Sequence, residues 1–190
     1  MTGLRLLAVA AAMVAALIGC DPSRPAGPVP PGPSAPVAPQ APPDPQTLLR
    51  AGATAIANLP GSTLVFIAED TDSAEDTGTW TARLVTTDGT EQQVTLGVDG
   101  DVVLDGPVPV TDTGTDKVER RERVGAARLD YRGAVDKTLA AVPDGSITEL
   151  RLNGDADGVR WAATVWDLTP VAHRVTLDAA SGELIADTTG

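Results

Sequence analysis

The chain has 190 residues and a formal net charge of −12, with 14 basic against 26 acidic residues. This acidic balance argues against nucleic acid as a partner and gives no reason to expect adhesion to anionic lipid head groups. The single cysteine, Cys20, allows no internal disulfide, so the folded part must be stabilised by burial alone.

Residues 1–19 have the organisation of an export signal, with Arg5 near the start and an apolar run from Leu6 to Ile18. This run is too short to span a bilayer as a helix. It ends in Leu17-Ile18-Gly19-Cys20, which resembles the lipobox of bacterial lipoproteins. The resemblance implies that Cys20 becomes the acylated first residue and anchors the protein at the extracytoplasmic face of the cell membrane, where two acyl chains hold stably. The alternative is an ordinary secretory signal with an incidental cysteine.

A proline-rich segment follows the signal. Eleven of the 24 residues from Pro22 to Pro45 are proline. We interpret residues 20–43 as a disordered linker of polyproline II character, which at ~3.1 Å per residue could extend to roughly 75 Å. Recognition by an SH3 or WW domain is the functional alternative.

Residues 44–105 predict a helix followed by strands. Asp44 is placed to cap the helix and Pro45 suits its first position, where the missing N–H costs nothing. One face of the helix carries Leu48, Gly52, Ala55 and Leu59. Pro60-Gly61 ends it, and Leu64 to Ala68 predict a strand largely covered on both sides.

The next stretch, from Glu69 to Gly78, is acidic and predicts an exposed loop, with calcium binding as an alternative. A strand with Trp80, Ala82 and Leu84 on its inward face then leads to Asp88-Gly89, a short-hairpin signal. The return strand carries Val94, Leu96 and Val98, and Asp99-Gly100 turns the chain into residues 102–104.

Residues 106–126 are interpreted as a connector. Six basic residues occur in the stretch from Lys117 to Arg132, broken by Glu119, Glu122 and Asp130. This basic stripe is either a solvated segment with mutual salt bridges or a surface that docks on the acidic loop of the first half or on an anionic partner such as a wall polymer.

Residues 127–190 predict the same order of elements. Asp130 caps a helix whose apolar stripe consists of Tyr131, Ala134, Val135, Thr138, Leu139 and Val142. Pro143-Asp144-Gly145 turns into strands, whose inward residues are Thr148, Leu150 and Leu152, then Trp161, Ala163 and Val165, then Val175 and Leu177. A turn at Asp178 to Gly182 precedes a last strand at Leu184 to Ala186.

The two stretches align at a separation of 81 residues, with Trp80 on Trp161, Val94 on Val175 and Leu96 on Leu177. Residues 130–186 resemble the PepSY module of exported bacterial proteins, on the helix, the turn after it and the closing pattern Leu177-Asp178-Ala179-Ala180-Ser181-Gly182-Glu183-Leu184. Residues 44–105 are a divergent first copy. We therefore expect an α+β protein of two repeated units, each with one helix packed on an antiparallel sheet of three or four strands. The sequence leaves open whether the two repeats form one continuous sheet or two separate sheets.

No motif for catalysis emerges. His173 is in phase with Val175 and Leu177, so a strand histidine with a satisfied ring is expected rather than a general base. Asn153, Asp155 and Asp157 imitate half of a calcium loop, but Thr164 stands where its bidentate Glu belongs, so a polar hairpin turn is the simpler interpretation. We expect no enzyme, no cofactor and no metal.

These observations predict a non-catalytic envelope lipoprotein that binds a protein or peptide. The resemblance to PepSY modules implies a role in restraining an envelope peptidase. The alternative is a carrier that holds a small apolar ligand or lipid between helix and sheet.

Overall fold

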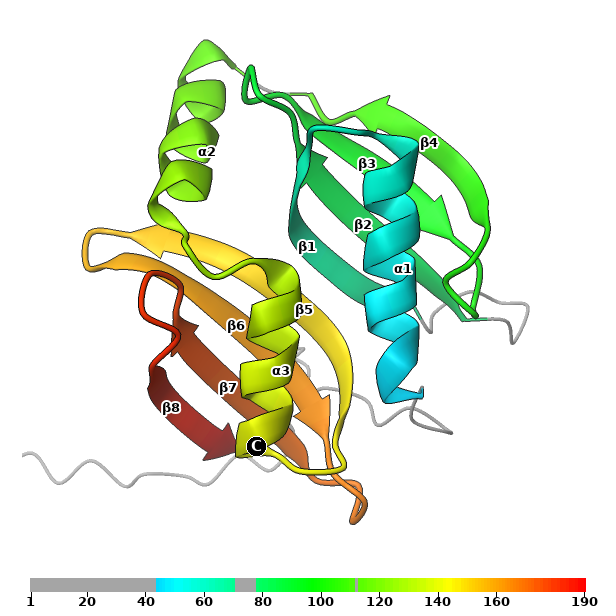
Figure 1. Ribbon diagram of the computed structural model, residues 1–190, viewed down its shortest axis with the longest axis vertical. Helices are drawn as coiled ribbons and strands as arrows, with labels where there is room; N and C mark the ends of the chain where they lie inside the picture. Colours follow the sequence, from blue (N-terminus) through cyan, green and yellow to red (C-terminus); the bar gives the residue numbers. More distant parts are fainter. Residues whose placement is uncertain (1–43, 71–77, 112) are drawn as a thin grey trace, which may run out of the picture. The chain divides into compact units, whose positions relative to one another are not determined.

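The computed structural model describes residues 44–70, 78–111 and 113–190, which contain three helices and eight strands. Their order is α1 (Pro45–Asn58), β1 (Thr63–Asp70), β2 (Thr79–Val85), β3 (Glu91–Leu96), β4 (Val103–Pro109), α2 (Gly114–Ala126), α3 (Tyr131–Ala141), β5 (Ser146–Asp155), β6 (Gly158–Trp166), β7 (Ala172–Asp178) and β8 (Leu184–Thr189) (Figure 1). The predicted signal peptide, Cys20, the linker and positions 71–77 of the acidic loop lie outside the described residues.

The starts of α1 and α3 confirm the capping predictions. The side chain of Asp44 accepts a hydrogen bond from the Gln46 amide at 2.9 Å, and Pro45 occupies the first turn of α1. Asp130 likewise accepts from the Gly133 amide at 2.9 Å. After α3, Asp144 adopts a positive φ of 60° in the predicted Pro-Asp-Gly turn, a conformation that aspartate tolerates better than most residues.

All eight strands belong to one antiparallel sheet in the order β4-β3-β2-β1-β5-β6-β7-β8. Its two halves join where β1 pairs with β5, with Phe66 opposite Arg151, Ile67 opposite Leu150 and Ala68 opposite Glu149. The prediction of two repeated units, each with one helix on a sheet of three or four strands, is therefore wrong, because the described residues form one eight-stranded sheet with three helices. Two separate sheets would expose the edges of β1 and β5, and their pairing satisfies these backbone groups.

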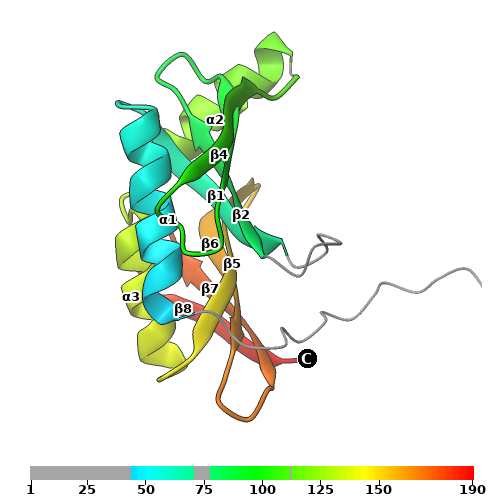
Figure 2. The same ribbon diagram turned by 90° about the vertical axis from the view of Figure 1, so that its right-hand side faces the viewer.

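Helices α1 and α3 lie on the same side of the sheet (Figure 2), and the core fills the space between them and the strands. Trp80 and Trp161, which the sequence places inward, are almost completely buried. The indole N–H of Trp80 donates to the Val98 carbonyl at 3.1 Å, and that of Trp161 donates to the Leu129 carbonyl at 2.9 Å. Both rings are thus buried without leaving a polar group unsatisfied.

Strand β1 departs from the predicted pattern. Its register shifts between Leu64 and Phe66, so that Leu64 and Val65 are both buried although they are neighbours in the chain. Beyond the shift, Ile67 faces the helices, while Phe66 and Ala68 face away from them and are only half-buried. The strand is therefore fully buried on the side of the helices and half-buried on the other side.

Helix α2 falls within the stretch interpreted as a connector and was not predicted. Thr113 and Asp116 form a capping box, in which the Thr113 amide donates to the Asp116 carboxylate at 2.7 Å and the Asp116 amide donates to the Thr113 hydroxyl at 3.4 Å. None of the residues of α2 is fully buried, so the helix lacks the apolar stripe by which the sequence revealed α1 and α3.

Candidate functional site

The sheet face turned away from α1 and α3 is covered by neither of these helices (Figure 2). Residues directly opposite each other in antiparallel strands share a face, so the register defines this open face. One row across it runs Gln93, Arg83, Phe66, Arg151, Ala162 and Thr176. The next row runs Thr95, Thr81, Ala68, Glu149, Thr164 and Arg174. Threonine, alanine and arginine dominate, in contrast to the Trp, Leu and Val of the covered face.

The centre of the open face is an aromatic ring between two arginines. Phe66 lies on β1, and its neighbours Arg83 on β2 and Arg151 on β5 are directly opposite it. The guanidinium carbon of Arg83 is 5.2 Å from the centroid of the Phe66 ring, and that of Arg151 is 4.9 Å from it. Both distances are in the range of cation–π attraction. The ring therefore holds two cations in place at the junction of the two halves.

Two glutamates lie beside these arginines. Glu149 Oε1 accepts from Arg151 at 2.8 Å (Nη2) and 3.1 Å (Nε). Glu91 is 3.5 Å from Arg83 but only 2.8 Å from Arg120 of α2, so it is bound mainly to Arg120. Both central arginines remain well exposed, with side-chain exposures of 44% for Arg83 and 49% for Arg151.

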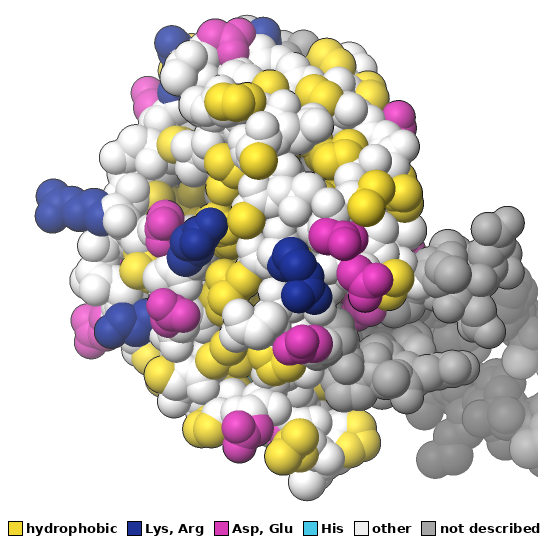
Figure 3. Space-filling model, turned by 45° about the vertical axis from the view of Figure 1, so that its right-hand side comes forward, with side chains coloured by type: hydrophobic (Ala, Val, Ile, Leu, Met, Phe, Trp, Pro, Cys, Tyr) yellow, Lys and Arg dark blue, Asp and Glu magenta, His cyan; other side chains and the backbone are white. Residues whose placement is uncertain are grey.

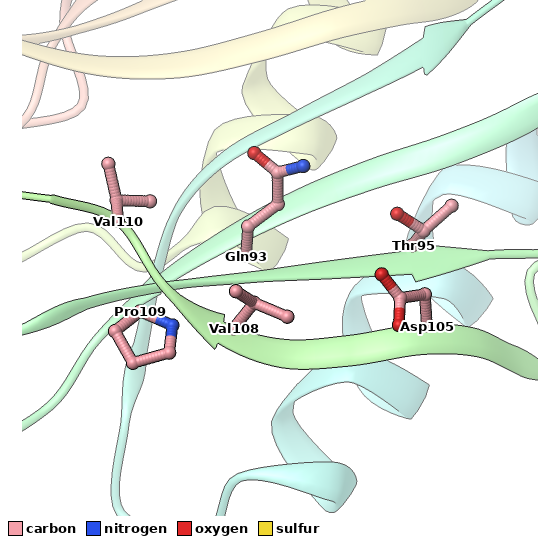
Figure 4. Close-up of a pocket in the computed structure, with 6 residues that line it drawn as sticks. All are labelled: Gln93, Thr95, Asp105, Val108, Pro109 and Val110. Carbon is pink, nitrogen blue, oxygen red and sulfur yellow. The ribbon is translucent and has the colours of Figure 1, made fainter.

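A pocket of about 280 Å³ opens on the same face at the β4 edge. Gln93 and Thr95 of β3 point into it together with Asp105 and Val108 of β4, and Pro109 and Val110 complete its wall (Figure 4). Gln93 is directly opposite Arg83 on β2, so the pocket continues toward the arginine row. Its lining mixes polar and apolar groups, and none of these residues comes from a helix.

His173 is held by two carboxylates. Its Nδ1 is 3.1 Å from Asp187 of β8, and its Nε2 is 3.4 Å from Asp167, which follows β6. Burial favours the neutral ring, but the hydrogen bonds and charges of Asp187 and Asp167 together outweigh it and raise the pKa of His173. A ring with an acid at each nitrogen suits the doubly protonated form, in which both nitrogens donate. This agrees with the expectation of a strand histidine whose ring is satisfied.

Asp167 has a structural task of its own. It accepts from the amides of Val171 and Thr169 and from the Thr169 hydroxyl, at 2.8 to 2.9 Å. These hydrogen bonds, with that of Val171 the most important, lower the pKa of Asp167 to about 2. The carboxylate therefore orders the turn before β7 and is ionised wherever His173 titrates.

The residues that imitate a calcium loop form the β5–β6 hairpin. Asp155 accepts from the Asp157 amide at 2.9 Å and pairs with Arg160 at 2.7 Å, while Asp157 is 3.6 Å from Arg160. Within the described ranges, no group of three or more His, Cys, Asp or Glu side chains is arranged to hold a metal ion. The polar-turn interpretation therefore accounts for these residues.

Among the described residues, the basic stripe contacts two acids of the first half, Asp88 and Glu91. Lys117 lies 3.7 Å from Asp88 in the β2–β3 hairpin, and Arg120 lies 2.8 Å from Glu91 at the start of β3. From the other end of α2, Arg123 donates to the Leu152 carbonyl of β5 at 3.4 Å. Helix α2 thus links a hairpin of the first half to a strand of the second, a role closer to docking than to a solvated lead-in.

Sequence reasoning did not identify the Arg83–Phe66–Arg151 group. The alternation of Arg83 with Ala82 and Leu84, and of Arg151 with Leu150 and Leu152, places both arginines away from the core. Their meeting over Phe66 depends on the register shift in β1 and on the β1–β5 pairing, and neither has a signature in the local sequence.

The hydrophobic side chains on the surface shown in Figure 3 do not form one continuous patch. On the side shown in Figure 3, hydrophobic, acidic and basic side chains are interspersed. In the described part of the chain, no helix is long and apolar enough to cross a membrane.

Comparisons with known proteins find a similarity to a solved structure. No family model matches the sequence, and a search of the curated proteins finds no match. A crystal structure of a protein assigned as a lipoprotein from Clostridium difficile 630 aligns with a TM-score of 0.45 and 14% sequence identity, over 71% of this chain and 87% of that one.

Proposed function

We propose that the chain is a lipid-anchored, non-catalytic binding module of a bacterial cell envelope, and that its sheet engages an envelope protein or peptide. The observation that carries the proposal is the one-sided cover of the sheet: α1 and α3 pack on one face, and in the described part of the chain neither helix covers the other face (Figure 2). An uncovered antiparallel face with accessible edges offers two recognised modes of peptide binding, face docking and strand addition.

The two edges of the sheet differ in what they can accept. Strand β4 contains Pro107 and Pro109, which lack an N–H, and its pairing with β3 is irregular. Strand β8 has no proline and exposes Leu184 (48%) and Ile185 (51%). Strand addition is therefore proposed at β8, because β4 is protected in the way natural proteins protect edges.

The anchor is proposed at Cys20, from the resemblance of Leu17-Ile18-Gly19-Cys20 to a lipobox. Replacing Cys20 by Ala should release the protein to the medium or leave an uncleaved precursor, and mass spectrometry should find no acyl chains on it. Mature, acylated and membrane-bound Cys20→Ala protein would contradict the anchor.

The resemblance of residues 130–186 to PepSY modules adds a finer proposal, that the bound protein is an envelope peptidase. In support of a non-catalytic role, His173 is engaged by Asp167 and Asp187, so its ring is not available as a general base. The carrier alternative gains nothing from the pocket at β3 and β4, because neither α1 nor α3 contributes to its lining.

Crosslinking of the full chain in its own cells tests the binding module. We expect a discrete crosslinked partner that is lost in Ile185→Lys, because a charged lysine on an edge strand opposes strand addition. The matched control is Leu168→Lys, which makes the same kind of change at a 77% exposed residue outside the strands. Stoichiometric lipid in extracts of the purified protein, with no crosslinked partner, would favour the carrier instead.

A further inference from the structure

We propose that the Arg83–Phe66–Arg151 row of the open face binds carboxylate side chains of an acidic, extended peptide segment. The inference rests on the proposed function, since it names the chemistry of the partner that the sheet would engage. Its evidence is the geometry of three residues on β2, β1 and β5, which are directly opposite one another across the junction of the two halves.

The Phe66 ring preorganises the side chains of Arg83 and Arg151. Each guanidinium lies about 5 Å from the Phe66 centroid, at 5.2 Å for Arg83 and 4.9 Å for Arg151. Contact with the ring restrains two otherwise flexible side chains and leaves their N–H edges for bidentate bonds to a carboxylate. A ligand would then lose less entropy on binding than it would at two unrestrained arginines.

Arg83 and Arg151 use only some of their hydrogen-bond donors within the protein. Each guanidinium has five N–H donors in a planar fork. Among the described residues, the hydrogen bonds found for Arg83 involve only Nη1, at 3.5 Å from a glutamate held more closely by Arg120. The contacts of Arg151 are made by Nε and Nη2 to a single oxygen of Glu149. Both cations therefore keep donors for an external acid.

The spacing of the two arginines indicates which class of anion they suit. The arginines are on strands to either side of β1, so their backbones are two strand spacings apart, or roughly 10 Å. Two cations spread in this way suit two carboxylates along one segment better than one compact anion. In an extended peptide, alternate side chains point the same way about 7 Å apart. The two guanidinium carbons are each about 5 Å from the same ring centroid and so at most about 10 Å apart, a span in which the restrained pair can meet two such side chains. The adjacent row offers Ala68 and Thr81, small residues over which a backbone could lie.

The charge of the arginine row is complementary to that of an acidic segment. The row that contains Gln93, Arg83, Phe66, Arg151, Ala162 and Thr176 has cations and no acid, in a chain with a net charge of −12. Glu149 of the next row is 2.8 Å from Arg151, whereas Glu91 is 3.5 Å from Arg83 and is bound mainly to Arg120. An acidic segment would be repelled by most of the molecule and attracted to this row, most strongly at Arg83. Electrostatics would thereby set both the position and the specificity of the partner.

Fluorescence anisotropy with the full chain in detergent micelles provides the test. The probe is a fluorescein-labelled peptide of alternating Glu and Thr, and a Gln-Thr peptide of the same length is its neutral counterpart. We expect the acidic peptide to bind more tightly and its affinity to fall with added salt. Arg83→Gln and Arg151→Gln should each weaken binding about fivefold, the effect of losing one exposed ion pair of ~1 kcal/mol. Glu149→Gln should strengthen binding, because it removes an acid that competes for Arg151.

Arg132→Gln is the matched control. Arg132 also stacks on an aromatic ring, 5.5 Å from the centroid of Tyr131, but it belongs to α3 on the covered side of the sheet. Its replacement changes the net charge equally and should leave the affinity within about twofold if the effect is local. An equal loss in Arg132→Gln and Arg83→Gln would mean that only net charge matters, and would overturn the inference.

Three further outcomes would also overturn the inference. They are equal affinity for the acidic and neutral peptides, unchanged affinity in the Arg83→Gln and Arg151→Gln variants, and competition by inorganic phosphate at the concentration of the acidic peptide. Failure of the inference is distinguishable from failure of the proposed function. A crosslinked partner that is lost in Ile185→Lys but kept in both arginine variants would place binding at the β8 edge and leave the binding module standing.

Discussion

The two faces of the sheet are built from different kinds of residues. On the covered face, Trp80, Ile67, Leu150 and Trp161 are almost completely removed from water by α1 and α3. On the open face, Phe66 is only half-buried under arginines, and its neighbours are mainly threonine and alanine. Under the proposed function, the residues that stabilise the fold and those that recognise the partner lie on opposite sides of the same strands. Substitutions on one face should unfold the protein, and substitutions on the other should change what it binds.

The largest effect is expected from Leu150→Ala on the covered face. Leu150 is fully buried and is directly opposite Ile67 where the two halves of the sheet pair. Loss of its side chain should lower the free energy of unfolding by about 2–5 kcal/mol, from lost burial and the cavity left behind. Chemical denaturation should still show one transition, because both halves share this strand pair.

Leu184→Ala is the control for Leu150→Ala, since the same atoms are removed from a side chain that is 48% exposed. We expect a loss of under about 1 kcal/mol. Similar losses at the two positions, or two separate transitions in the wild-type protein, would contradict a single sheet with one buried face.

A second, smaller effect tests how α2 is attached. Arg120 and Glu91 form an ion pair at 2.8 Å, with only 12% of each side chain exposed. Arg120→Met should cost about 1–3 kcal/mol, because it leaves a largely buried carboxylate with only the more distant Arg83. Arg121→Met, an exposed position on the same helix, should change stability by under about 0.5 kcal/mol. Equal effects in thermal melts would show that the pair does not hold the helix.

The covered face could be predicted from the sequence because its signals are local. Asp44 and Asp130 predict the starts of two capped helices, and the alternation around Trp80 and Trp161 predicts which residues point inward. The junction of the halves could not be predicted, since the pairing of Ile67 with Leu150 joins strands more than eighty residues apart. Two helix-plus-sheet units were the natural interpretation of local patterns that say nothing about which strands become edges.

The same limit applies to α2 and to the open face. The capping box of Thr113 and Asp116 is a local signal in the sequence, but no buried apolar stripe follows it in α2 to indicate a packed helix. The neighbours of Phe66 are fixed by cross-strand register, which a register shift in β1 alters by one residue. The structure was therefore required to identify the candidate site. The division of most strands into an inward and an outward face could be predicted from the alternation of residues alone.

The pH dependence of stability probes the β8 edge. The pKa of His173 is raised in the folded protein, so its contribution is fully present below the unfolded value of about 6.5 and is lost as pH rises through the folded pKa. Asp167 and Asp187 face the ring from the turn before β7 and from β8, and the sheet-facing residues of α3, Val135 and Thr138, carry no charge. His173→Gln should therefore destabilise the protein more at about pH 5.5 than at about pH 8.5.

Asp157→Asn, a change in an exposed hairpin acid, is the control for that pH profile and should show no such difference between the two pH values. Denaturant midpoints at both pH values give the comparison. A wild-type stability advantage over His173→Gln that grows toward high pH would mean that the ring is neutral in the folded state, contrary to its position between two acids.

The smallest effect on stability is expected for Arg83→Gln and Arg151→Gln on the open face. Both side chains are nearly half exposed, and exposed ion pairs and cation–π contacts contribute little net free energy, so each variant should unfold within about 0.5 kcal/mol of wild type. Phe66→Leu should cost somewhat more, because the ring is half-buried at the strand junction. Guanidinium chloride would screen these charges, so urea denaturation is the appropriate measurement. If either arginine variant lost several kcal/mol, the row would belong to the structure of the sheet, and the division between a stabilising face and a recognising face would fail at its centre.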